Sequence, residues 1–90
     1  MHRFKKGDFV KMGIPEDVFR SRASANSSSR NYIDYIAKGG IVEVVNKDDN
    51  SVQLLMEGRA RSERSNWFKM DWFELADMTL HKIKQESQRL

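Results

Sequence analysis

Residues 40–57, GIVEVVNKDDNSVQLLME, decide the fold. They hold two runs rich in β-branched and aliphatic residues, 40–45 and 51–57, separated by the turn-forming residues 46–50. This pattern predicts a β-hairpin. Alternate residues of a strand face the same side, so the apolar rows of the two strands can meet over one core. The residues in these rows are Val42 and Val44 on one strand, and Val52, Leu54 and Met56 on the other.

Three further short strands are predicted on either side of this hairpin. Residues 8–12 form a short β-type run between two glycines, which indicates a first strand. After the hairpin, residues 66–70 return as a strand, Asp71 interrupts the pattern, and residues 72–75 form a last short strand. We therefore expect five strands in all.

The connection between the first strand and the hairpin is expected to be mostly loop. Residues 20–31 contain nothing apolar larger than alanine, so we expect them to be exposed and mobile. Before them, Pro15 with acidic residues behind it favours a short turn of helix. Residues 32–36 have apolar side chains at helical spacing, with Asn31 as a candidate cap and Gly39 as a candidate terminator. They predict a helix of one or two turns, with an extended segment as the alternative.

The chain is expected to form one domain. Ninety residues with 39% hydrophobic content suffice for one core and are too few for two. We assign residues 1–76 to the β domain. Residues 77–90 place a narrow apolar stripe among lysines, which predicts a C-terminal helix or tail.

Several function classes are disfavoured by what the chain lacks. It has no cysteine, and its two histidines, His2 and His81, lie far apart in the sequence. Without a cluster of ligand-type residues at metal spacing, we expect no metal and no other cofactor. No nucleophile–base arrangement and no glycine-rich phosphate loop is present, so we expect no enzyme activity. We also expect no small-molecule substrate.

A cytoplasmic location is expected. No apolar run approaches the roughly 20 residues that span a bilayer, and the first residues lack the hydrophobic stretch of a signal peptide. We therefore expect no membrane association.

The order of these elements resembles that of the SH3-like small barrels, which include the KOW and Tudor groups. The likeness is found in Lys6-Gly7-Asp8-Phe9-Val10, in residues 39–44 and in Trp72-Phe73-Glu74-Leu75, and it covers roughly residues 4–76. It implies a mainly β fold, an SH3-like five-stranded small barrel with a long first loop and a short C-terminal helix. The acidic and aromatic residues with which SH3 domains bind proline-rich peptides are missing, which disfavours that ligand. The chain also resembles compact phage early proteins that act on host machinery.

Arginine side chains are concentrated in two of the connections. Arginine makes bidentate contacts to phosphate and stacks on bases, and the neighbouring serines and asparagines add hydrogen-bond donors. The alternative is that the charges only keep two loops solvated; the net charge of +3 does not decide between them. The candidate phosphate-binding residues are Arg20, Arg22 and Arg30 in the first connection, and Arg59, Arg61 and Arg64 in the later one.

Aromatic side chains are candidates for stacking on unpaired bases. The aromatics considered are Tyr32, Tyr35, Trp67 and Trp72. We assign Trp72, with Phe73, to the core. Because Tyr32 and Tyr35 adjoin the first arginine segment, we expect these two to be exposed and include both in the candidate site.

The function expected from the sequence is non-enzymatic binding of nucleic acid, either RNA or DNA, through contacts of the arginine-rich segments with its backbone. The alternative is a protein-interaction module that binds and modulates a larger host protein or complex, because arginine is also favoured at protein interfaces. Both hypotheses need the two arginine segments to share one face.

Overall fold

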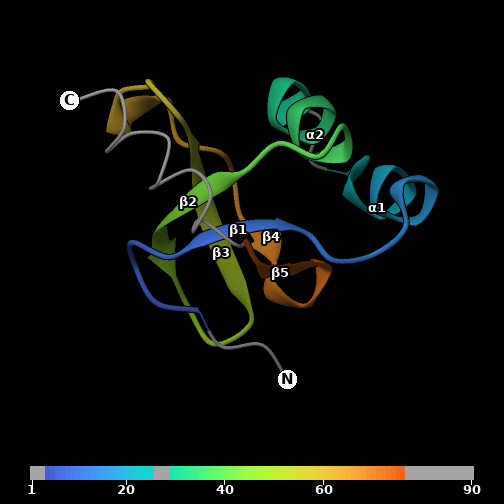
Figure 1. The fold of residues 1–90 in the computed structure, drawn as a ribbon, viewed down its shortest axis with the longest axis horizontal. Coiled ribbons are helices and arrows are strands. Elements are labelled where there is room, and N and C mark those ends of the chain that lie inside the picture. The colour runs from blue at the N-terminus through green and yellow to red at the C-terminus, as the bar shows by residue number, and fades with distance from the viewer. Residues whose placement is uncertain (1–3, 26–28, 77–90) are drawn as a thin grey trace, which may run out of the picture.

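A computed structural model describes residues 4–25 and 29–76. Five antiparallel strands form one sheet in the order β4-β3-β2-β1-β5 (Figure 1). The predicted mainly β architecture is confirmed in this form. The strands are β1 (Phe9–Met12), β2 (Val42–Lys47), β3 (Ser51–Met56), β4 (Phe68–Lys69) and β5 (Phe73–Leu75); the helices are α1 (Glu16–Ala23) and α2 (Arg30–Ala37); and two short 3-10 turns are η2 (Arg61–Glu63) and η3 (Met70–Trp72).

The predicted hairpin is confirmed as β2 and β3. Its turn is stabilised by the carboxylate of Asp48, which accepts hydrogen bonds from the backbone N–H groups of Asn50 at 2.9 Å and Ser51 at 2.7 Å. All five apolar residues expected to face a common core are buried. The register shifts between Val44 and Asn46, so the pairing is interrupted by a bulge near the turn end of β2.

The connection between β1 and β2 differs from the expected loop. Residues 20–23 continue α1, and residues 30–31 begin α2, so the prediction of an exposed loop across these positions was wrong. The predicted short helix after Pro15 therefore exists but is longer than expected. Phe19 and Ala23 are four residues apart and both fully buried, so this face packs against the rest of the protein. Tertiary burial, rather than local composition, stabilises α1.

Helix α2 confirms the helix predicted for residues 32–36, and the alternative of an extended segment was wrong. Its N-cap position is Ser29 rather than the expected Asn31. Its end is where Gly39 predicted: the N–H of Gly39 donates to the carbonyl of Ile36 and that of Gly40 to the carbonyl of Tyr35, both at 2.9 Å. This is a Schellman ending, and the φ of 96° at Gly39 explains why glycine is favoured there.

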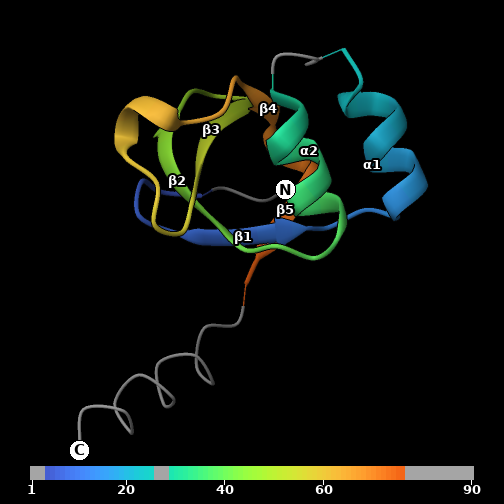
Figure 2. The same ribbon diagram turned by 90° about the horizontal axis from the view of Figure 1, so that it is seen from above.

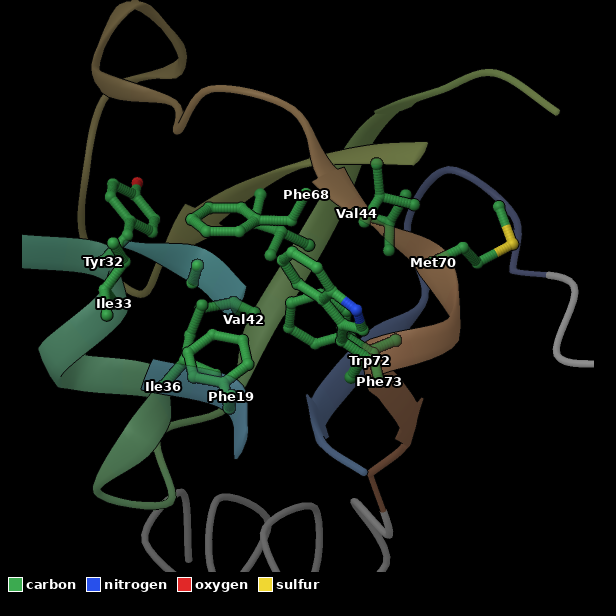
Figure 3. Packing of buried hydrophobic residues seen from close by; sticks show 14 of the residues in the cluster. Phe19, Tyr32, Ile33, Ile36, Val42, Val44, Phe68, Met70, Trp72 and Phe73 are labelled. Atoms are coloured by element: carbon green, nitrogen blue, oxygen red, sulfur yellow. The ribbon is translucent and has the colours of Figure 1, made fainter. Parts of the chain in front are cut away.

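The core lies between the sheet and the helices. Figure 2 shows the two helices side by side, with α2 nearer to β2 and β3 than α1 is. The ring of Phe19 on α1 lies 5.9 Å from that of Phe73 and 6.1 Å from that of Trp72, both edge to face (Figure 3). The ring of Phe68 lies 6.3 Å from that of Phe19. Trp72 and Phe73 are both buried, which confirms their assignment to the core.

The last two strands are shorter than expected. Strand β4 covers only Phe68–Lys69 of the predicted residues 66–70, and η3 then carries the chain to β5. Strands β4 and β5 end the sheet order, and no pairing between them occurs among the described residues. The sheet is thus an open one in its hydrogen bonding. The helix or tail predicted at 77–90, and with it the division into 1–76 and 77–90, lies outside the described residues.

Candidate nucleic-acid interface

Two of the six candidate arginines are held in ion pairs. On Arg20, Nε lies 2.9 Å from Oε2 of Glu16, and Nη2 lies 3.3 Å from Oδ1 of Asp34. Arg20 therefore links α1 to α2. On Arg59, Nη1 lies 3.8 Å from Oε2 of Glu63. Both charges are already partly satisfied within the protein, which reduces what they can offer a ligand.

The ion pairs between α1 and α2 shift the pKa values of Arg20 and Asp34. The hydrogen bond with Glu16, and then that with Asp34, raises the pKa of Arg20 above its usual value. The hydrogen bond from Lys38, and then that from Arg20, lowers the pKa of Asp34 below 3.8. Asp34 therefore remains a carboxylate at neutral pH and continues to hold both cations.

The other four arginines are solvent-exposed. Within residues 4–25 and 29–76, none of them lies within 4 Å of a carboxylate oxygen. The guanidinium of Arg64 is oriented by neutral groups instead: its Nε donates to Oε1 of Gln53 and its Nη1 to the carbonyl of Arg61, both at 3.3 Å. Exposed guanidinium groups of this kind are available to phosphate. The four residues are Arg22, Arg30, Arg61 and Arg64.

The structure brings the two arginine segments together. The hydroxyl of Tyr32 on α2 donates to the carbonyl of Glu63 at 2.9 Å. The N–H of Asn66 donates to Oγ of Ser29 at 3.0 Å. The start of α2, which carries Arg30, is therefore bound to the segment that follows η2. Two loops at opposite poles of the molecule would not make these bonds.

The expectation for Tyr32 was wrong. Its side chain is only 3% exposed, and its hydroxyl is used in two hydrogen bonds inside the protein, so it cannot stack on a base without unfolding. Tyr35 is half-buried, with its hydroxyl 3.4 Å from the carbonyl oxygen of Ile41. Tyr32 therefore provides no exposed ring, whereas the partly exposed Tyr35 lines a surface hollow together with Arg59.

The exposed ring is that of Trp67, which the site predicted from sequence leaves out. Trp67 is 42% exposed, and Lys69 two residues later is exposed as well. The signal was present in the alternation of this segment, because Phe68 and Met70 face the core and their neighbours consequently face outward.

A hollow of about 660 Å³ lies beside Trp67, and we call it the Trp67 hollow. It joins the end of α1 to the start of β3 and to the segment from Trp67 through η3. Arg22 and Lys69 thus belong to one concave surface with an exposed indole. Its walls include Arg22, Ser51, Trp67, Lys69, Asp71 and Trp72.

We use the name cationic strip for the exposed cations of these neighbouring segments that have no carboxylate partner among the described residues. It consists of Arg61, Arg64, Arg30, Arg22 and Lys69. The hydrogen bond from Asn66 to Ser29 joins two of the segments that carry these cations, and Arg22 and Lys69 both line the Trp67 hollow. The segment from η2 through η3 also carries two carboxylates, Glu63 and Asp71.

A second concavity of about 500 Å³, the Phe9 groove, lies over β1, β2, β3 and the end of α2. Phe9 is 40% exposed at this surface, and two glutamates line it. Arg59 lines it as well, so the groove is apolar with charges of both signs. The groove is lined by Phe9, Tyr35, Ile41, Glu43, Leu55 and Glu57, among others.

Metal binding and membrane insertion were also considered for the described part of the chain. In residues 4–25 and 29–76, no three histidine, aspartate or glutamate side chains converge on a point where a metal ion could be held. In the same residues, no helix has the length and apolar character needed to span a bilayer.

No protein-family model, curated protein or solved structure matches this chain. The functional assignment therefore depends on the arrangement of its own side chains.

Proposed function

We propose that this protein binds nucleic acid, RNA or DNA, and that the cationic strip contacts the phosphate backbone. The observation that carries the proposal is the pair of hydrogen bonds, Tyr32 to Glu63 and Asn66 to Ser29, which joins the two arginine segments. Cations without carboxylate partners gain most from phosphate, since no existing ion pair has to be broken.

The fold supports this use of the surface. The strand order β4-β3-β2-β1-β5, with the two end strands joined by the three-residue turn η3, is compatible with an SH3-like small barrel whose edges approach each other. We include this barrel in the proposal. A compact sheet with exposed connections presents its loops as a binding surface, which is where function is usually located.

The test is binding of a mixed pool of labelled RNA and DNA at several salt concentrations. The logarithm of affinity should fall linearly with the logarithm of salt concentration, by about 0.7 to 0.9 per phosphate neutralised. The Arg30→Ala/Arg64→Ala double variant should bind more weakly and with a shallower slope. The matched control is Lys5→Ala/Lys6→Ala, which removes the same charge from exposed positions near β1 and should bind like the unchanged protein. Absence of binding at low salt, or an equal loss in both variants, would overturn the proposal.

Protein binding is the second candidate, and the Phe9 groove favours it. A partially exposed phenylalanine beside Glu43 and Glu57 suits a peptide segment that carries an apolar side chain next to lysine or arginine. Arg59 lines the same groove, and its charge is paired with Glu63. The discriminating experiment is capture from a nuclease-treated lysate. This candidate requires a partner that is kept by Arg30→Ala/Arg64→Ala and lost by Phe9→Ser. A partner lost on nuclease treatment would instead be bound through nucleic acid.

A further inference from the structure

The Trp67 hollow combines three chemical features in one concave surface. Trp67 supplies an exposed aromatic face, Arg22 and Lys69 supply cations, and Asp71 supplies a carboxylate acceptor. The volume of about 660 Å³ is in the range of small-ligand sites and exceeds that of one nucleobase. The two cations favour a ligand that carries negative charge over an uncharged metabolite.

We propose that the Trp67 hollow takes one unpaired nucleobase, so that the nucleic acid bound by this protein is single-stranded. The inference rests on the proposed function and identifies its substrate class. Stacking on an aromatic side chain is how proteins hold bases of single strands without reading their sequence. The indole of Trp67 is the exposed large aromatic ring that adjoins the cationic strip.

The charges orient the nucleotide. Arg22 and Lys69 line the hollow and have no ion pair among the described residues, so the phosphates on either side of the base are attracted to them. Asp71 repels phosphate but accepts hydrogen bonds from the amino groups on base edges. A nucleotide therefore enters with its base against Trp67 and Asp71 and with its phosphates on the two cations.

A duplex cannot make the same contact. Its bases are covered above and below by their neighbours, and exposing one face requires unstacking it at a cost of a few kcal/mol. Duplex DNA or RNA would therefore contact the cationic strip alone. This difference gives the inference its measurable consequence.

The test compares a labelled 12-nucleotide strand of mixed sequence, as RNA and as DNA, with the same strand in a duplex. We expect the single strands to bind about tenfold more tightly than the duplexes. Trp67→Leu removes the aromatic face and should weaken single-strand binding about tenfold. It should leave duplex binding within about twofold, because the cationic strip is intact. Trp67→Phe is the matched control and should retain most of the single-strand affinity.

Tryptophan fluorescence of the unchanged protein provides a measurement that needs no variant. The chain has two tryptophans, and only Trp67 is exposed, since Trp72 is 9% exposed. Single strands should protect the exposed component from quenching by acrylamide, and duplexes should not. Equal protection by both, or an equal effect of Trp67→Leu on both ligands, would overturn the base-binding inference and leave the proposed function standing. Absence of salt-dependent binding to either ligand would overturn the proposed function itself.

Discussion

The hydroxyl of Tyr32 accepts a hydrogen bond from the backbone N–H of Met56 at 3.0 Å, and through it α2 is bound to β3. Replacing Tyr32 by phenylalanine leaves this N–H buried without a partner and also breaks the bond to Glu63. We expect Tyr32→Phe to lower the free energy of unfolding by about 1–3 kcal/mol, measured by urea denaturation. Tyr35→Phe is the control; its hydroxyl lies 3.4 Å from the Ile41 carbonyl in a half-buried site, and its loss should cost less.

The two glycines after α2 should respond differently to the same substitution. At Gly40 a Cβ atom would lie 2.6 Å from the carbonyl oxygen of Tyr35 and against its ring, so Gly40→Asn should cost about 1–3 kcal/mol or more. At Gly39 no neighbouring atom lies within 4 Å of a Cβ, but the φ of 96° is one that side chains rarely adopt, asparagine more readily than most. Gly39→Asn should therefore cost about 1 kcal/mol, less than Gly40→Asn, in thermal denaturation. An equal loss at both positions would contradict the close packing of Tyr35 on Gly40.

Asp34 should make stability sensitive to acid. Its pKa is lowered in the folded state by Lys38 and then by Arg20, so its contribution is complete above the ordinary pKa of 3.8 and is lost as the pH falls through the lower folded value. The difference in unfolding free energy between the unchanged protein and Asp34→Asn should shrink as the pH falls from about 5 to about 2.

Arg20 and Arg22 should have separate roles although they lie two residues apart. Arg22→Ala should weaken nucleic-acid binding and reduce the salt slope by about 0.7 to 0.9, because one phosphate contact is lost. Arg20→Ala removes the link between the helices and should leave the slope within about 0.3 of its original value. Titrations at four salt concentrations would measure both. A reduced slope for Arg20→Ala with an unchanged slope for Arg22→Ala would instead place the phosphate contact on the face of α1 that carries Arg20.

Phe19 and Phe9 provide a matched pair for core packing. Phe19 is fully buried against the rings of Phe68, Trp72 and Phe73, so Phe19→Ala should cost about 3–5 kcal/mol. Phe9 is 40% exposed, and Phe9→Ala should cost about 1 kcal/mol or less. Chemical denaturation of the two variants tests both values, and a comparable loss at Phe9 would mean that its exposed face is covered.

The strands were the most predictable part of the fold, because their signal is local. Val42 and Val44 stand in an uninterrupted run rich in β-branched residues, and the turn chemistry at Asp48 is contained within a few residues. Strand β4 is shorter than its local sequence pattern predicted. Where a strand begins and ends depends on the strand it pairs with, and that partner comes from elsewhere in the chain.

The helices and the site depended on distant contacts. The length of α1 follows from burial of Phe19 and Ala23 against residues some fifty positions away, which composition does not reveal. Glu16, four residues before Arg20, was a partner that the sequence offered, but the second partner, Asp34, is on another helix and could not be found from sequence. The burial of Tyr32 could have been predicted from sequence, because Tyr32 lies on the same helical face as Ile36, and both are buried.

The bonds that hold Glu63 and Asn66 against α2 make the cationic strip a preorganised surface. If a nucleic-acid strand binds there as proposed, it has to adopt the shape of the protein, so the conformational cost of association would fall mainly on the nucleic acid. Pliable, weakly stacked polymers such as oligouridylate conform cheaply, whereas stiff, helically stacked oligoadenylate does not. The affinity of the protein for different single strands would then depend more on the flexibility of the strand than on the identity of its bases.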